Sequence, residues 1–329
     1  MNRALLVDSF GRRIDYLRLS VTDRCNLRCL YCLPKAGFLF KGVQELLTDD
    51  EILRLATIMA RMGISKVRVT GGEPLVRPGV VDLIAKLSVV PGVVDVSLST
   101  NGVLFAPMVC DLWNAGLRRI NISLDTLNAN KFKEVTRFGQ IEDVLTSIHE
   151  ALKLGYDPVK LNVVVMRGIN DDEISDFVAL TKSLPVHVRF IELMPIGETG
   201  FFSETTWVSL DEIKTKCGDL EPATDFEQPK GWGPAVYYKA PNSLGTVGFI
   251  GALGCNFCNR CNRLRLTSSG KLHPCLASDI AVDLGTALRS DSSDESIQSL
   301  ILKALEIKPE RHHMESGIVR EAFMCSLGG

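Results

Sequence analysis

The sequence predicts an α/β fold, an incomplete TIM-like (β/α)6 barrel with a C-terminal region that covers its open side. Three observations support it. Short β-branched runs alternate with longer helical patterns up to residue 193. The runs themselves alternate polar and apolar residues, and the rhythm changes in the last third of the chain. The predicted strands are residues 16–20, 66–70, 93–100, 118–124, 159–166 and 187–193.

The predicted strands carry polar residues on one face. Parallel strands that are covered by helices on both sides are apolar on both faces. Here Val67 and Val69 alternate with Arg68, and Arg18 and Lys160 alternate with apolar residues in their own strands. Because successive side chains point to opposite faces, one side of the sheet packs on helices and the other lines a polar space. A closed eight-stranded barrel is filled with apolar residues, so this pattern indicates an open barrel that holds a large charged ligand.

The helices between the strands have recognisable ends, as residues 48–63 illustrate. Thr48 and Glu51 form a capping box, and apolar residues recur at helical spacing behind them. Gly63 supplies the signal that ends the helix. Together with the short strands on either side, such helices predict parallel βα units.

The chain changes character after Leu193. Segments rich in glycine, proline and aromatic residues lead to a cysteine group near residue 260, and the sequence ends in Leu-Gly-Gly. We therefore expect residues 1–225 to form the partial barrel and residues 226–329 to form the C-terminal region.

Composition excludes several classes of protein. The 329 residues carry a net charge of −2, whereas a nucleic-acid-binding domain is typically strongly basic. No apolar run is long enough for a membrane span, and the first residues lack the pattern of a signal peptide. We therefore expect a cytoplasmic protein with no nucleic-acid or membrane partner. In that reducing compartment the clustered members of its ten cysteines are expected to bind metal or to act in catalysis.

The first cysteine group, CNLRCLYC, follows the first predicted strand and spaces its thiols as CxxxCxxC. Cys25, Cys29 and Cys32 have no further Cys or His between Tyr31 and Cys110 to complete a closed metal site. Iron–sulfur clusters are commonly held by four thiolates, so three leave one iron open to a ligand that is not protein. A zinc site completed by a distant residue is the alternative.

This spacing, with an aromatic residue before the third cysteine, resembles the signature of the radical S-adenosylmethionine (SAM) superfamily. The resemblance implies a [4Fe–4S] cluster whose free iron binds SAM and splits it to a 5′-deoxyadenosyl radical. It also implies an incomplete (β/α)6 barrel. The positions that it assigns to SAM binding are Tyr31, Gly72, Glu73, Ser123 and Met194.

The second cysteine group narrows the resemblance. Cys258, Cys261 and Cys275 accompany the run NRLR, and this pattern, together with TGGEP, STNG and the final GG, resembles the GTP 3′,8-cyclase family (molybdenum cofactor biosynthesis protein A). That family implies a second [4Fe–4S] cluster on these three cysteines, with Cys255 left over. The implied GTP-binding residues are Arg18, Arg68, Thr100, Lys160, Arg189, Arg263 and Arg265. The implied catalytic residues are Arg18, Arg263, Arg265, Gly328 and Gly329, the two glycines being a tail that reaches into the active site.

The resemblance also implies a reaction and its partners. The radical would abstract hydrogen from C3′ of GTP, and the C3′ radical would add to C8 of guanine, as the first step of molybdenum cofactor biosynthesis. The family is dimeric, depends on an electron donor and passes its product to a cyclic pyranopterin monophosphate synthase. Two alternatives remain: a zinc-ribbon module that binds nucleic acid, and a radical SAM peptide-modifying enzyme with an auxiliary cluster.

Overall fold

The computed structural model describes residues 6–34, 42, 45–197, 199–251, 253, 257–312, 314 and 323–328. Its strands form one sheet in the order β12-β11-β10-β1-β2-β3-β4-β5-β6-β9-β8-β7. The strands in chain order are β1 (Tyr16–Ser20), β2 (Lys66–Thr70), β3 (Asp95–Thr100), β4 (Ile120–Ser123), β5 (Val159–Val165), β6 (Val186–Glu192), β7 (Glu221–Pro222), β8 (Val236–Lys239), β9 (Thr246–Ile250), β10 (Arg263–Leu266), β11 (Lys271–His273) and β12 (Val282–Asp283). None of the helices in these residues is both long and apolar enough to cross a membrane.

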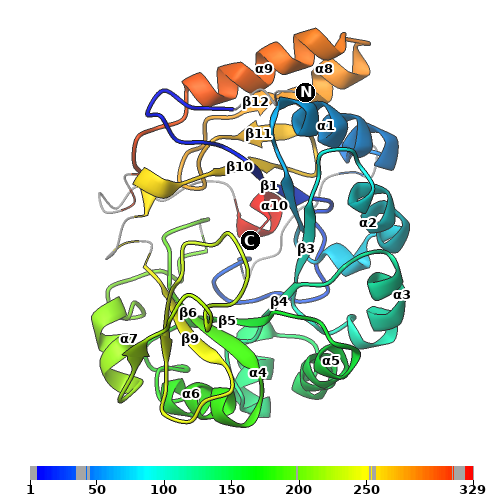
Figure 1. Ribbon diagram of the computed structural model, residues 1–329. Coiled ribbons are helices and arrows are strands. Elements are labelled where there is room, and N and C mark those ends of the chain that lie inside the picture. The colour runs from blue at the N-terminus through cyan, green and yellow to red at the C-terminus, as the bar shows by residue number, and fades with distance from the viewer. Residues whose placement is uncertain are drawn as a thin grey trace.

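Helices cover the outer side of this curved sheet (Figure 1). They are α1 (Asp49–Met62), α2 (Val80–Ser88), α3 (Val109–Asn114), α4 (Ala129–Thr136), α5 (Ile141–Leu154), α6 (Ile174–Ser183), α7 (Leu210–Lys216), α8 (Leu284–Arg289) and α9 (Asp294–Glu306). The short helix α10 (Met324–Leu327) lies inside the barrel instead. Short 3-10 turns are η2 (Pro74–Val76), η3 (Ala106–Met108) and η4 (Cys258–Arg260). The capping box of Thr48 and Glu51 begins α1 as predicted, and the Gly63 backbone in the left-handed region (φ 120°) ends it.

The six predicted strands are present, each within two residues of its expected ends, and they pair in parallel from β1 to β6. The fold is therefore the incomplete barrel that the strand pattern predicted. Two further strands of the C-terminal region extend it in parallel, because β10 pairs with β1 and β9 pairs with β6. The C-terminal region thus pairs with both edges of the six-stranded barrel, and a division near residue 225 stays a prediction.

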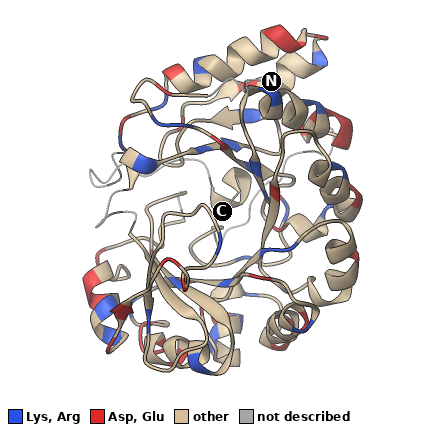
Figure 2. Cartoon of the chain, in the orientation of Figure 1, with Lys and Arg blue, Asp and Glu red and all other residues tan. Residues whose placement is uncertain are grey.

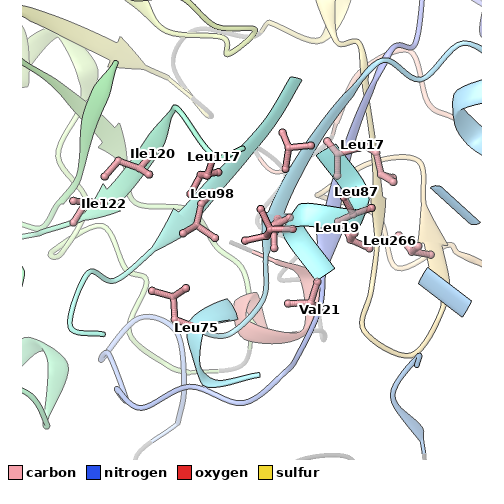
Figure 3. Close-up of a cluster of buried hydrophobic side chains, with 14 of the residues drawn as sticks. Leu17, Leu19, Val21, Leu75, Leu87, Leu98, Leu117, Ile120, Ile122 and Leu266 are labelled. Carbon is pink, nitrogen blue, oxygen red and sulfur yellow. The ribbon is translucent and has the colours of Figure 1, made fainter. Parts of the chain in front are cut away.

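The apolar core lies between the sheet and the helices. Leu17 and Leu19 of β1 point to this side together with Leu98 of β3 and Ile120 of β4, and Leu87 of α2 meets them (Figure 3). All five side chains are buried. The apolar parity of each strand therefore faces the helices, which leaves the polar parity for the inner side of the barrel.

Polar residues of neighbouring strands line up across that inner side. The register pairs Arg18 with Arg265 on one side and with Arg68 on the other. Further round the sheet, Asn162 pairs with Arg189. Lys and Arg occur on strands near the middle of the molecule as well as on the outer helices (Figure 2). The sheet register thus builds a cationic wall inside the barrel.

Candidate active site

The first cysteine loop lies at the carboxyl end of β1. Backbone hydrogen bonds from Arg28 to Thr136 and from Leu30 to Val135 fix it against the end of α4. Cys25, Cys29 and Cys32 are half-buried free thiols. Their pKa values are raised by burial and by one another, and for Cys32 first by a hydrogen bond with Cys325; that of Cys25 rises to about 12. The three thiols are therefore close neighbours in a poorly solvated place, where a bound metal would favour the thiolate forms.

The spacing of these thiols does not suit a single ion. In the described part of the chain, no group of three Cys, His, Asp or Glu side chains is arranged to hold one metal ion. In an iron–sulfur cluster each thiolate binds a different iron, so its ligands stand further apart than those of one zinc ion. Because no three of these side chains are arranged around one ion in the described part of the chain, the cysteines of this loop fit a cluster better than zinc.

The Gly-Gly-Glu segment after β2 holds the chain that leads into this loop. Gly72 N–H donates to the Thr22 carbonyl at 2.8 Å, and Glu73 N–H donates to the Arg24 carbonyl at 2.8 Å. A Cβ atom at Gly72 would collide with the backbone of Asp23 and Arg24. The glycine is needed because two backbones meet here, immediately before Cys25.

Glu73, a predicted SAM-binding residue, also makes three hydrogen bonds within the protein. Its carboxylate is fully buried; Oε1 accepts hydrogen bonds from Leu75 N–H (3.0 Å) and the Thr100 hydroxyl (2.8 Å), and Oε2 accepts one from Asn101 N–H (2.6 Å). Burial raises the pKa of Glu73 to about 7. Since each oxygen has two acceptor positions, one position on Oε2 remains for a ligand donor. An ammonium group there would compensate the buried charge.

Tyr31 is tied to the barrel wall by Asp125. The Tyr31 hydroxyl donates to Asp125 Oδ2 at 2.7 Å, and Val164 N–H donates to Oδ1 at 2.9 Å. Burial raises the pKa of Asp125 to about 6. Of the other residues expected at SAM, Ser123 is exposed at the end of β4 and Met194 lines the central cavity. The first loop and the barrel wall therefore share one buried hydrogen bond beside the cysteines.

The central cavity collects five of the predicted GTP-binding residues. Its lining includes Arg18, Arg68, Arg189, Arg263 and Arg265. It adjoins an outer hollow of about 550 Å³, since the walls of both include Arg263 and Phe257. This arrangement connects the interior of the barrel with the surface and surrounds the connection with guanidinium groups.

The electrostatics of this cavity require an anion. Buried nitrogens of Arg68 (Nη1), Arg189 (Nε) and Arg263 (Nε) have no hydrogen-bond partner within the described residues. None of these three arginines forms an ion pair with a carboxylate in that part of the chain. Burial lowers the pKa of Arg18 to about 10, and repulsion from Arg68 adds to the effect. Buried and mutually repelling cations without counter-charges are costly unless a ligand supplies the negative charge.

Two predicted GTP-binding residues lie apart from the arginine cluster. Thr100 donates to Glu73 and accepts from Gly102 N–H at 3.0 Å, so its hydroxyl faces the end of β3. Lys160 is near the start of β5, where its Nζ donates to the Lys230 carbonyl at 2.7 Å. Burial lowers the pKa of Lys160 to about 6, with further contributions from Arg189 and Arg68. The Lys160 amine is thus close enough to Arg189 and Arg68, which line the cavity, to be affected by their charge.

The second cysteine group lines a hollow next to the central cavity, since the walls of both include Met194, Phe257 and Arg263. Cys258 and Cys261 flank η4, Cys275 follows β11, and all three line one hollow with Arg263 and Arg265. Burial raises the pKa of the Cys261 thiol, but Lys308 and Arg263 outweigh burial and bring it down to about 7. Three half-buried cysteines with cationic neighbours again fit a thiolate-bound cluster. Cys255 lies outside the described residues.

The C-terminal tail enters the space between the two groups. The Gly328 carbonyl accepts hydrogen bonds from Arg265 Nη1 at 2.8 Å and from Arg18 Nη2 at 3.3 Å. Gly328 has φ 73°, and a Cβ atom there would meet Thr70 Cγ2 at 2.5 Å. The penultimate glycine thus fits against the inner wall of β1 and β2, where a larger residue would not. Gly329 lies outside the described residues.

Sequence reasoning missed several residues of this site. Tyr16, whose hydroxyl accepts from Arg68 Nε, and Asn162 share the inner face of the sheet with the arginines. Lys66, also on that parity, lies 3.4 Å from the centroid of the Trp232 ring and 2.6 Å from Asp15. The alternation of polar residues along the strands could have identified these three. Lys308, which reaches Cys261, carries no comparable signal.

Two family models together match most of the chain. The model of the Radical SAM superfamily matches residues 19–181, which include the first cysteine loop and the strands of the partial barrel. The model named Molybdenum Cofactor Synthesis C matches residues 186–314, which include the second cysteine group.

Solved structures share the fold at low sequence identity. SuiB from Streptococcus suis bound to S-adenosylmethionine has a TM-score of 0.58 at 12% identity, over 95% of this chain and 67% of that one. The protein anSMEcpe with bound AdoMet has a TM-score of 0.56 at 13% identity, over 92% and 82%. At such identities the likeness concerns the fold alone.

Curated relatives are far more similar and match over nearly their whole length. The GTP 3′,8-cyclase of Desulforamulus reducens is 48% identical over 98% of this chain and 100% of the relative. The GTP 3′,8-cyclase of Heliobacterium modesticaldum is 49% identical over the same shares. With the two cysteine groups and the barrel between them, this similarity means that the chain belongs to the GTP 3′,8-cyclase family of the radical SAM superfamily.

Proposed function

We propose that this chain is a GTP 3′,8-cyclase, which converts GTP to 3′,8-cyclo-7,8-dihydro-GTP in the first step of molybdenum cofactor biosynthesis. The observation that carries the proposal is the buried cationic cavity inside the barrel, next to the second cysteine group. Its arginine nitrogens without partners call for an anion with several oxygens, and a triphosphate supplies one. Full-length relatives of the same name support this choice of substrate.

The proposal requires two [4Fe–4S] clusters and SAM. Cys25, Cys29 and Cys32 would hold one cluster, and Cys258, Cys261 and Cys275 the other, in each case with one iron left for a non-protein ligand. When bound, the first cluster and SAM would supply the radical chemistry needed for hydrogen abstraction at C3′ of GTP. The free acceptor position of Glu73 suits the amino group of SAM.

The protein's own residues bind and orient the substrate. Arg18, Arg68 and Arg189 present guanidinium groups to the phosphates, and Arg263 and Arg265 extend this contact to the edge of the second cysteine group. The Gly328 carbonyl holds Arg265 and Arg18 together from the tail side. Holding C3′ near C8 in an enclosed space favours ring closure over side reactions, since the reactive radical is kept from water.

The test is an anaerobic assay of the reconstituted enzyme with GTP, SAM and dithionite. GTP deuterated at C3′ is expected to yield deuterated 5′-deoxyadenosine and a cyclised nucleotide in equal amounts. ATP in place of GTP is expected to yield neither product. Formation of 5′-deoxyadenosine that does not depend on GTP, with no label transfer, would reject the cyclase.

The alternatives are not favoured. SuiB and anSMEcpe, each also solved with a bound peptide, share only the fold with this chain, at 13% identity. A zinc-ribbon module would not need a partial barrel or a buried arginine cavity.

The assembly and location of the enzyme are further parts of the proposal. We expect a homodimer in the reducing cytoplasm, in keeping with the free state of the cysteines that the structure describes. An electron donor would reduce the first cluster, and a cyclic pyranopterin monophosphate synthase would consume the product. We also keep residues 1–225 and 226–329 as functional regions that carry one cluster each. Analytical ultracentrifugation of the anaerobic protein tests the dimer.

A further inference from the structure

Lys308 is a buried cation beside the second cysteine group. It follows α9 directly, and only 3% of its surface is exposed. Within the described residues it forms no ion pair with a carboxylate. A lysine almost never occupies such a position unless its charge is compensated.

The ammonium group of Lys308 uses all its donors on the two segments that carry the second cysteines. Nζ donates to the Pro274 carbonyl at 2.5 Å, to the Arg263 carbonyl at 3.0 Å and to Cys261 Sγ at 3.5 Å. An ammonium has three donors and no acceptor, so these contacts satisfy it completely. Pro274 precedes Cys275, and Arg263 begins β10 after Cys261. One side chain therefore joins the segment of Cys261 to that of Cys275.

We propose that Lys308 is a positioning residue of the second cluster, which fixes the cysteine segments and stabilises the negative charge on the Cys261 sulfur. The inference rests on the proposed function in one respect, namely that these cysteines hold a cluster. Hydrogen bonds and net charge at the sulfurs set the reduction potential of iron–sulfur clusters. Lys308 thus makes the second cluster easier to reduce and retains it during turnover.

Arg12 offers a matched comparison on the opposite side of the same group. Its guanidinium donates to the carbonyls of Cys258 (2.8 Å), Pro309 (2.7 Å) and Glu310 (2.7 Å), and it pairs with Asp8 at 2.6 Å. It therefore braces the neighbouring backbone, and its charge also acts on the Cys258 thiol, where it opposes the rise in pKa that burial causes. Arg12→Lys keeps this positive charge while it removes part of the backbone contacts, so it should affect retention of the cluster more than its potential.

The experiment uses the full chain in which Cys25, Cys29 and Cys32 are replaced by Ala, so that only the second cluster gives a signal. In this background we compare Lys308→Gln, Lys308→Arg, Arg12→Lys and, as a control on the exposed face of α9, Lys303→Gln. Iron is counted per chain, and the reduction potential is measured by a redox titration followed by electron paramagnetic resonance. Circular dichroism reports the fold of each variant.

Lys308→Gln is expected to shift the potential to more negative values and to lose part of the roughly four irons per chain. Lys308→Arg should restore the potential, Arg12→Lys should lower mainly the iron content, and Lys303→Gln should change neither. An unchanged potential in Lys308→Gln at normal fold overturns the electrostatic role. If the parent chain itself binds no iron, the proposed second cluster fails instead, so the two failures are distinguishable.

Discussion

The two cysteine groups have opposite electrostatic surroundings. Carboxylates lie near the first group, since Glu73 raises the pKa of Cys25 and Asp125 raises that of Cys29, in addition to burial. Cations lie near the second, where Lys308 and Arg263 lower the pKa of Cys261 to about 7 against the effect of burial. The first environment suits a cationic ligand and the second an anionic one. SAM carries an ammonium and a sulfonium group beside its carboxylate, and GTP carries a triphosphate, so under the proposed function this asymmetry favours SAM at the first group and GTP at the second.

Serine substitutions at the cysteines should have the largest effects and should separate the roles of the two groups. Cys29→Ser should lose about four of eight irons and abolish SAM cleavage, whereas Cys261→Ser should lose about four irons but retain some SAM cleavage without cyclised nucleotide. The reason is that, under the proposed function, the first group would supply the radical, whereas the second would bind GTP. Iron counts with product analysis check this. Equal loss of SAM cleavage in both variants would mean that the two groups do not divide their labour.

Gly328→Ala should separate the tail from the wall between the two groups. A side chain at φ 73° costs about 1–2 kcal/mol, and here its Cβ would also collide with Thr70. The seated tail, which holds Arg18 and Arg265, should become less populated, so we expect kcat to fall roughly tenfold or more. Gly168→Ala is the control, because Gly168 has φ 71° but open space around it. Equal effects in both variants would assign the loss to backbone strain alone.

The pH dependence of GTP affinity should test whether the cationic side of the molecule binds the phosphates. With its pKa lowered to about 6, Lys160 is mainly neutral above pH 7 in the ligand-free protein, and a nearby phosphate raises that pKa again. Binding therefore takes up a proton, and affinity should fall by up to about tenfold from pH 7.5 to 8.5, where the phosphates are fully ionised. Isothermal titration in buffers of different ionisation enthalpy measures the proton. Lys160→Met should flatten the profile; proton release in the parent chain would contradict the assignment.

The same group links pH to stability. The pKa of Lys160 is 10.5 in its unperturbed state and about 6 in the fold, so the unfolded chain binds the proton more tightly between these values. The contribution of Lys160 to the free energy of unfolding of the ligand-free protein should therefore increase as the pH rises between these two values. Bound GTP should weaken this trend, because it restores the charged form of Lys160 in the folded protein.

Local sequence patterns predicted much of this site, whereas the rest of it depends on contacts between residues far apart in the chain. Alternation along short strands was enough to turn Arg18, Arg68 and Lys160 inward, because the period of a strand is independent of its partners. The strands β9 and β10 were not predicted, since they are short runs among Gly- and Pro-rich segments and gain their regularity from pairing with β6 and β1. Thr100 has an ordinary polar hydroxyl, and only the fold directs it to Glu73. A single lysine after a helix is normally a solvated residue, so the sequence contained no sign of the contact between Lys308 and Cys261.

Cys255→Ser should have the smallest effect and tests whether the second group is truly open. Cys255 lies three residues before Cys258, and the family pattern does not require a cysteine there. We expect the variant to keep about eight irons per chain and full activity, because Cys258, Cys261 and Cys275 suffice and the remaining iron is left for GTP. Iron analysis and the GTP assay measure both. Loss of iron in this variant would indicate a site closed by four thiolates, and the cationic surroundings of the second group would then serve GTP without contact between GTP and the cluster.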